Sequence, residues 1–265
     1  MSQEVDKNLP NLLAPTPTRP EYPLFVFLPG MDESTKLPLL QTASLNPAFD
    51  VRFLMIPPDF NTSWSVLAER VISLIDAELK QTPRHSVYLG GESFGGCLAL
   101  KVLEQAPRLF DKIILVNPAS SFNQYPWIHW GSLISRLLPE SLYQILSLAF
   151  VPFLANLRRI TPTNRQALLK SVQSTPIKSS VQRLSLLRHF ELNQQSLHQI
   201  TQPVLIVASK GDRLLPSVAE AKRLLKIFPH AQSIILPHSG HACLLEADVS
   251  LLKILETAAS SSKLS

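Results

Sequence analysis

The chain has 265 residues, a formal net charge of +5, 45% hydrophobic residues and 17% charged residues. This composition excludes a disordered, collagen-like or coiled-coil protein, and the length suits one α/β domain with an insertion. Its two cysteines are too few for a disulfide framework or a four-ligand zinc site, so we expect a reducing compartment.

The N-terminal segment is polar and rich in proline, and it carries no apolar stretch typical of a signal peptide. No apolar run reaches the roughly 18 residues that a membrane-spanning helix needs. We therefore expect a cytoplasmic protein, without a transmembrane helix, that is either free or peripheral to a membrane.

Strand and helix patterns alternate along the chain, which predicts a mostly parallel sheet with helices on both faces. The predicted strands are 23–28, 51–56, 86–89, 113–116, 204–208 and 233–236, and the predicted helices are 64–80, 94–105, 217–227 and 244–257. Between 119 and 202 the strand pattern stops, and the segment is typical of helices interrupted by prolines. We expect a polar arm at 1–22, a core at 23–118 and 203–258, a helical lid insertion at 119–202 and a tail at 259–265.

Glycine is scarce, with 8 residues, and seven of them fall in four short segments. One segment contains Gly91-Glu92-Ser93-Phe94-Gly95, a G-x-S-x-G motif between a predicted strand and a predicted helix. That context is typical of a nucleophile elbow, in which the serine hydroxyl is exposed on a strained turn. Phosphate-binding loops also join strands to helices, but no G-x-G-x-x-G or Walker lysine occurs here.

A nucleophilic serine needs a base that is oriented by a carboxylate. Asp212 follows the predicted strand at 204–208, and His241 follows the last predicted strand, in the chain order that this motif requires. We therefore expect Ser93, Asp212 and His241 to form a catalytic triad. The less favoured rivals are His238 for the base and Asp111 and Asp248 for the acid. Asp111 lies just ahead of a predicted strand and Asp248 within the predicted final helix, so we expect each to be a cap or a surface charge.

The oxyanion of such an enzyme is held by two backbone N–H groups. We assign these to Phe94, after the nucleophile, and to Met31, in the loop after the first predicted strand. The chemistry needs no cofactor and no metal. Glu92 either tunes the field at the nucleophile or has a solvated or packing role, and Cys97 and Cys243 are expected to pack rather than to act in redox regulation.

The insertion combines an aromatic cluster, an apolar stretch and a basic stretch. We expect Trp127, Trp130, Phe150 and Phe153 to bind substrate under a lid, with Gly131 as a hinge. Seven basic residues and no acidic ones lie between 141 and 190, so the basicity belongs to this segment and no nucleic-acid partner is expected. Two alternatives remain open for the insertion: peripheral contact with an anionic membrane, or a solvated cap packed only on its own protein.

Several segments resemble the hydrolase half of the plant plastid esterase/lipase/thioesterase family, which includes the phytyl ester synthases and is diacylglycerol acyltransferase-like. The resemblance rests on Phe27-Leu28-Pro29-Gly30-Met31-Asp32, Gly91-Glu92-Ser93-Phe94-Gly95-Gly96-Cys97-Leu98-Ala99-Leu100, Ile114-Leu115-Val116-Asn117-Pro118-Ala119, Leu215-Pro216-Ser217, and Gly240-His241 with Leu244-Leu245-Glu246. It implies an α/β-hydrolase fold acting on acyl esters of long isoprenoid or glyceride alcohols. The plant proteins also carry a second domain with an H-x-x-x-x-D motif, and no histidine here is followed by aspartate at that spacing.

The sequence therefore predicts a serine hydrolase of the esterase or lipase type, which takes an acyl ester or lipid substrate through an acyl-serine intermediate. Two alternatives stay open. One is an acyltransferase that passes the acyl group to phytol, diacylglycerol or another lipid alcohol, and the other is a catalytically inactive binding protein with a hydrolase fold.

Overall fold

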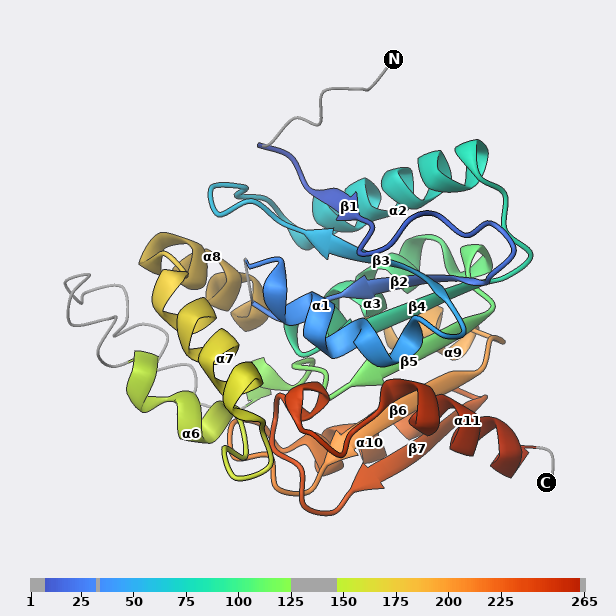
Figure 1. The fold of residues 1–265 in the computed structure, drawn as a ribbon. Coiled ribbons are helices and arrows are strands. Elements are labelled where there is room, and N and C mark those ends of the chain that lie inside the picture. Colours follow the sequence, from blue (N-terminus) through green and yellow to red (C-terminus); the bar gives the residue numbers. More distant parts are fainter. Residues whose placement is uncertain (1–7, 32–33, 125–146, 263–265) are drawn as a thin grey trace.

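The computed structural model describes residues 8–31, 34–124 and 147–262 of the chain (Figure 1). Within these residues one sheet has the strand order β1-β3-β2-β4-β5-β6-β7, and every neighbouring pair except β1 with β3 is parallel. The strands are β1 (Asn11–Leu13), β2 (Leu24–Leu28), β3 (Asp50–Met55), β4 (Val87–Glu92), β5 (Lys112–Val116), β6 (Val204–Ser209) and β7 (Ala231–Leu236). The predicted parallel sheet is confirmed.

Helices cover both faces of this sheet, as Figure 1 shows. They are α1 (Lys36–Thr42), α2 (Trp64–Gln81), α3 (Phe94–Gln105), α6 (Val151–Leu154), α7 (Pro162–Ser174), α8 (Ile177–Arg188), α9 (Gln194–His198), α10 (Ser217–Leu225) and α11 (Leu251–Ser262). Strand side chains point alternately to opposite faces, so β2 contributes Leu24, Val26 and Leu28 to one core and Phe25 and Phe27 to the other. Both faces of the strand are buried, which explains its unbroken apolar sequence.

The end of the chain differs from the prediction of one helix over 244–257. A short 3-10 turn, Cys243–Leu245, comes first, and α11 begins only at Leu251. Between them Glu246 makes an antiparallel bridge with Ile160, which holds this stretch extended. Asp248 consequently lies in a turn before the helix and not inside it, so that expectation was wrong.

Two elements, β1 and α1, have no counterpart among the predicted strands and helices. The strand β1 is only three residues long, lies between prolines, and pairs antiparallel with the outer side of β3. Partial burial of all its residues gives it no alternating pattern. The helix α1 has no side-chain cap and is only seven residues long, so no sequence signal marks where it begins.

One part of the described insertion packs on the core through a third apolar cluster. Side chains of α6 and α7 meet α1 and the Cys243–Leu245 turn, and Figure 1 shows α6, α7 and α8 together at one side of the sheet. The members of this cluster are Leu37, Val151, Ala155, Ile160, Ala167, Leu168 and Leu245. The insertion is thus fixed to the segment that follows the last strand.

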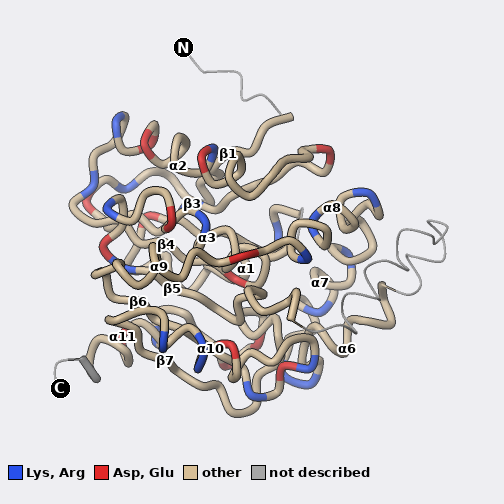
Figure 2. Tube along the Cα trace, turned by 180° about the vertical axis from the view of Figure 1, so that it is seen from behind, with Lys and Arg blue, Asp and Glu red and all other residues tan. Residues whose placement is uncertain are grey.

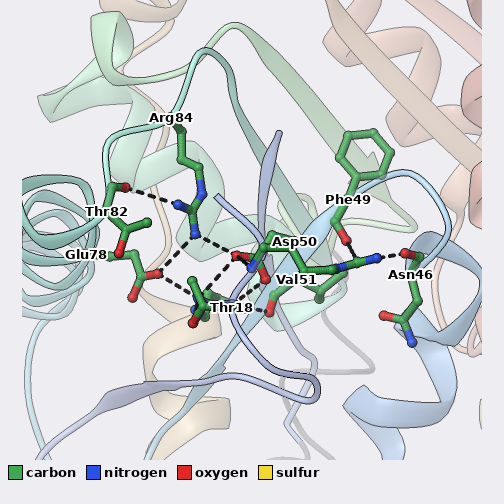
Figure 3. Close-up of polar contacts among 10 residues, drawn as sticks. Thr18, Asn46, Phe49, Asp50, Val51, Glu78, Thr82 and Arg84 are labelled. Atoms are coloured by element: carbon green, nitrogen blue, oxygen red, sulfur yellow. Dashed lines mark hydrogen bonds and ion pairs between the residues drawn. The ribbon is translucent and has the colours of Figure 1, made fainter. Parts of the chain in front are cut away.

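Charged side chains form a buried cluster at the amino end of β3 (Figure 3). Asp50 accepts hydrogen bonds from Arg52 Nη1 at 2.7 Å and from Arg84 Nη2 at 2.6 Å, and Arg52 also pairs with Glu78 of α2 at 2.7 Å. The backbone N–H of Arg19 donates to the same aspartate at 3.0 Å. The cluster therefore joins the N-terminal segment, β3, α2 and the turn before β4.

Replacing Asp50 with asparagine should lower the free energy of unfolding by about 3 kcal/mol or more, because two buried guanidinium groups lose their shared counter-ion. Urea denaturation measures this change. The matched control is Asp59→Asn, since the pair between Asp59 and Lys178 is exposed and should contribute little. Equal midpoints for the two variants would contradict the prediction.

Candidate active site

Ser93 occupies the turn between β4 and α3, with φ 54° and ψ −114°. A non-glycine residue rarely adopts a positive φ, so the turn stores strain that the surroundings must hold. The Ser93 N–H donates to Val116 O at 3.0 Å, and its carbonyl accepts from Ala119 N at 3.1 Å. At Gly95 a Cβ atom would lie 1.9 Å from Leu28 O, so only glycine lets the turn approach β2 so closely.

Three side chains that are distant in sequence meet at this turn. His241 Nε2 lies 2.8 Å from Ser93 Oγ, and His241 Nδ1 lies 2.7 Å from Asp212 Oδ2. His241 as a whole is only 4% exposed. A hydroxyl, an imidazole and a carboxylate connected in this order form the arrangement that activates a serine for nucleophilic attack on an acyl carbon.

Asp212 is held by donors from the loop that follows it. Its Oδ1 accepts the backbone N–H groups of Leu214 and Leu215 at 2.8 and 2.9 Å, and its Oδ2 accepts the Ser217 hydroxyl. Burial alone would raise the pKa of this carboxyl, but the charge and hydrogen bond of His241, with these donors, hold the pKa below its ordinary value. Asp212 thus stays ionised beside the imidazole.

The pKa of His241 is shifted in the opposite direction. Burial would lower it, but the negative charges of Asp212 and, more weakly, Glu92 raise it above the ordinary value. Glu92 is 3% exposed and accepts a hydrogen bond from Gln41 of α1. The solvated role considered for Glu92 is therefore wrong, and its charge lies within the electrostatic reach of the imidazole.

The rival residues lie elsewhere. His238 is exposed, and its carbonyl accepts from Asn156 Nδ2 at 3.1 Å. Asp111 is exposed and accepts the N–H of Val87, the first residue of β4, at 2.7 Å, and Asp248 pairs with Arg159. Among the described residues no group of three His, Cys, Asp or Glu side chains could hold a metal ion.

The two expected oxyanion donors are both near the nucleophile. Phe94 is the first residue of α3, so its N–H has no partner within the helix. The loop that leads to Met31 passes beside Ser93, because a Cβ atom built at Gly30 would lie 3.8 Å from Ser93 Cβ. The loop and the start of α3 therefore both lie beside Ser93.

Asn117 organises the carboxyl edge of the sheet, a role that the sequence analysis did not assign to it. Its φ is 42°, and its buried amide connects the end of β6 with the loop that carries His241. The Nδ2 group donates to Ser209 Oγ at 2.9 Å and to His241 O at 2.6 Å, while Oδ1 accepts the Ser209 N–H at 2.8 Å. A non-glycine residue in this conformation directly after a strand is a structural signal that sequence alone does not reveal.

The two cysteines and the expected lid residues differ in their exposure to solvent. Cys97 and Cys243 are fully buried, and burial raises the pKa of both thiols, which favours the packing role. Phe150 immediately precedes α6 and Phe153 lies within it. Their side chains are 56% and 48% exposed, and the centroids of their rings are 6.0 Å apart. Three other expected lid residues, Trp127, Trp130 and Gly131, lie outside the described residues.

Known proteins share both sequence and fold with this chain. It is 32% identical over 88% of its length to phytyl ester synthase 1, chloroplastic, of Arabidopsis thaliana, and spans 36% of that relative's length. It is 27% identical over 82% of its length to the pimeloyl-[acyl-carrier protein] methyl ester esterase of Vibrio campbellii, of which it covers 87%.

A solved structure of an esterase from Exiguobacterium antarcticum superposes with a TM-score of 0.71 at 18% identity, over 96% of this chain and 94% of that one. The family model described as the alpha/beta hydrolase fold matches residues 13–248. This chain therefore belongs to the alpha/beta hydrolase fold family.

Proposed function

We propose that the chain is a serine hydrolase that cleaves acyl esters of hydrophobic alcohols through an acyl-serine intermediate. The observation that carries the proposal is the continuous chain of hydrogen bonds from Ser93 Oγ through His241 to Asp212, at 2.8 and 2.7 Å. Ester-cleaving relatives support the same reaction class.

In the first step Ser93 Oγ attacks the ester carbonyl while His241 Nε2 takes the hydroxyl proton. The N–H groups of Met31 and Phe94 stabilise the oxyanion that forms. The carbon–oxygen bond of the ester then breaks, and the alcohol leaves with the proton from His241. In the second step water attacks the acyl-serine, His241 takes the proton of the water and returns it to Ser93, and the carboxylic acid is released.

The acyl acceptor defines the alternative function. The plant relative is named a phytyl ester synthase, which favours phytol or another lipid alcohol in place of water in the second step. Attack by an alcohol needs the same base and the same oxyanion donors, so the residues proposed here serve both outcomes. The two outcomes differ only in whether water or alcohol reaches the acyl-serine.

A peripheral membrane contact through the insertion is also proposed. Figure 2 shows Lys and Arg along α7 and α8, which contain no acidic residue, and Phe150 and Phe153 are exposed near them in the chain. Exposed aromatic rings beside cations suit an anionic lipid surface. No helix in the described residues is both long and apolar enough to cross a membrane.

Ser93→Ala should abolish labelling by a fluorophosphonate probe and lower ester hydrolysis by about 10⁴-fold or more, because the nucleophile is removed. Gel fluorescence and a chromogenic ester assay measure the two effects. The control is Ser65→Ala, which changes an exposed serine of α2. Labelling that persists without Ser93 would overturn the nucleophile, and a folded wild type that neither labels nor hydrolyses would support the inactive binding protein.

With a long-chain acyl ester as donor, phytol should compete with water and give a phytyl ester if the chain is an acyltransferase. Mass spectrometry of the products, with and without phytol, gives the ratio of phytyl ester to free acid. Free acid alone supports the hydrolase. Ester formation that persists in Ser93→Ala would contradict a shared acyl-serine.

Glu92→Gln should move the acidic limb of the kcat/KM profile to lower pH. The base must be neutral, so the rate falls as the pH drops through the pKa of His241, and removing one negative charge lowers that pKa. Glu256→Gln, on the exposed side of α11, is the control with no expected shift. A limb that stays in place or moves to higher pH would contradict the prediction.

Phe150→Ala/Phe153→Ala should weaken sedimentation with anionic vesicles, and raised salt should weaken it further in the wild type. The control is Val66→Ala/Ile235→Ala, which removes exposed apolar side chains from α2 and β7. If the wild type does not bind the vesicles at low salt, the insertion is a cap packed on its own protein and the membrane proposal fails.

A further inference from the structure

One short segment of the insertion lies directly against the loop that carries His241. Residues 154–164, here called the docking segment, run along residues 238–247, here called the histidine loop. Backbone contacts connect them at both ends of this stretch: the Ala242 N–H donates to Leu154 O at 2.8 Å, the Ala247 N–H donates to Arg159 O at 2.9 Å, and Ile160 forms an antiparallel bridge with Glu246.

Glu246 connects the two segments through its side chain. Its Oε1 accepts the backbone N–H of Gly240 at 2.8 Å, and its Oε2 accepts from Arg159 Nε at 2.6 Å. The carboxylate is 3% exposed, and Gly240 immediately precedes His241. A buried carboxylate with one oxygen on each segment fixes the distance between them.

Close packing beside Gly240 adds a steric constraint. A Cβ atom at this position would lie 2.6 Å from Asn156 N and 3.1 Å from Ala155 C, so the backbone of the docking segment touches the histidine loop directly. Asn164 Nδ2 also donates to Leu245 O at 2.9 Å. The loop that carries the imidazole thus has the sheet on one side and the insertion on the other.

We propose that Glu246 is a positioning residue for His241 and that Arg159 is its partner on the insertion, an inference that rests on the proposed hydrolase function. The carboxylate holds the Gly240 N–H, and thereby the start of the turn from which the imidazole reaches Ser93. Because general-base catalysis needs the Nε2–Oγ distance of 2.8 Å, a displacement of about 1 Å is enough to cost on the order of 10²-fold in rate. The insertion therefore sets the reactivity of the base through the backbone of the loop that carries it.

Glu246→Ala should lower both kcat for ester hydrolysis and the rate of labelling by a small fluorophosphonate by about 10²-fold, with little change in KM. Glu246→Gln keeps an oxygen acceptor for the Gly240 N–H and should recover about 10-fold of the loss. Arg159→Met should lower kcat as well, whereas Asp248→Asn removes only the exposed partner of Arg159 and should not.

The alternative, that Glu246 only stabilises the fold, is tested with Val71→Ala, which creates a cavity in the core contact of α2. It should lower Tm but leave the rate per folded molecule unchanged. The low-field NMR resonance of the proton between His241 and Asp212, assigned by its absence in His241→Ala, should shift in Glu246→Ala and not in Val71→Ala.

The outcomes separate this inference from the hydrolase function. If the wild type labels at Ser93 and Glu246→Ala labels as fast, with an unshifted resonance, the positioning role is overturned while the hydrolase stands. If the wild type does not label, the hydrolase proposal fails. A shifted resonance in Glu246→Ala would then still support a positioning role for Glu246.

Discussion

The parallel direction of β2, β4, β5, β6 and β7 is the constraint on which the site depends. Parallel strands end at one edge of a sheet, so the loops that follow them meet there although they are distant in sequence. Asn117 lies at this edge, and its amide hydrogen-bonds both Ser209 at the end of β6 and the carbonyl of His241. Without that shared edge, the strained turn at Ser93 would have no base to face.

In the sequence the insertion is a run of basic residues, but in the fold several of these residues contact the core. Arg159 pairs with Glu246 and Asp248, Lys178 pairs with Asp59, and Arg183 is buried and donates to Ile56 O. Some of the basic side chains of this segment thus connect the insertion to the core. The exposed cations of this segment among the described residues, Arg158, Arg165, Lys170 and Lys178, are available to an anionic surface.

The sequence predicted the parallel sheet, the main helices and the loops that carry Ser93, Asp212 and His241, because buried strands and glycine-bounded turns are local patterns. It missed β1, whose three half-buried residues have no periodicity, and it placed Glu246 and Asp248 in a helix because the apolar spacing there is helical. Their actual conformation depends on Ile160 and Arg159, about ninety positions earlier. The sequence named Asn117 and Ser217 within the family resemblance but did not reveal their roles. The contact of Asn117 with His241 is long-range, and that of Ser217 with Asp212 depends on how the loop after β6 folds.

The buried cluster around Asp50 lies at the amino end of β3 (Figure 3). Ser93 follows the carboxyl end of β4, and both β3 and β4 run parallel to β2. The length of a strand therefore separates the cluster from the nucleophile. The negative charges that raise the pKa of His241 are those of Asp212 and Glu92, which lie at the carboxyl edge. The sheet thus acts as an electrostatic spacer: its amino edge can hold several desolvated charges, and its carboxyl edge keeps a base whose proton affinity those charges do not set. Substitutions that tune stability at one edge and reactivity at the other can accordingly accumulate independently.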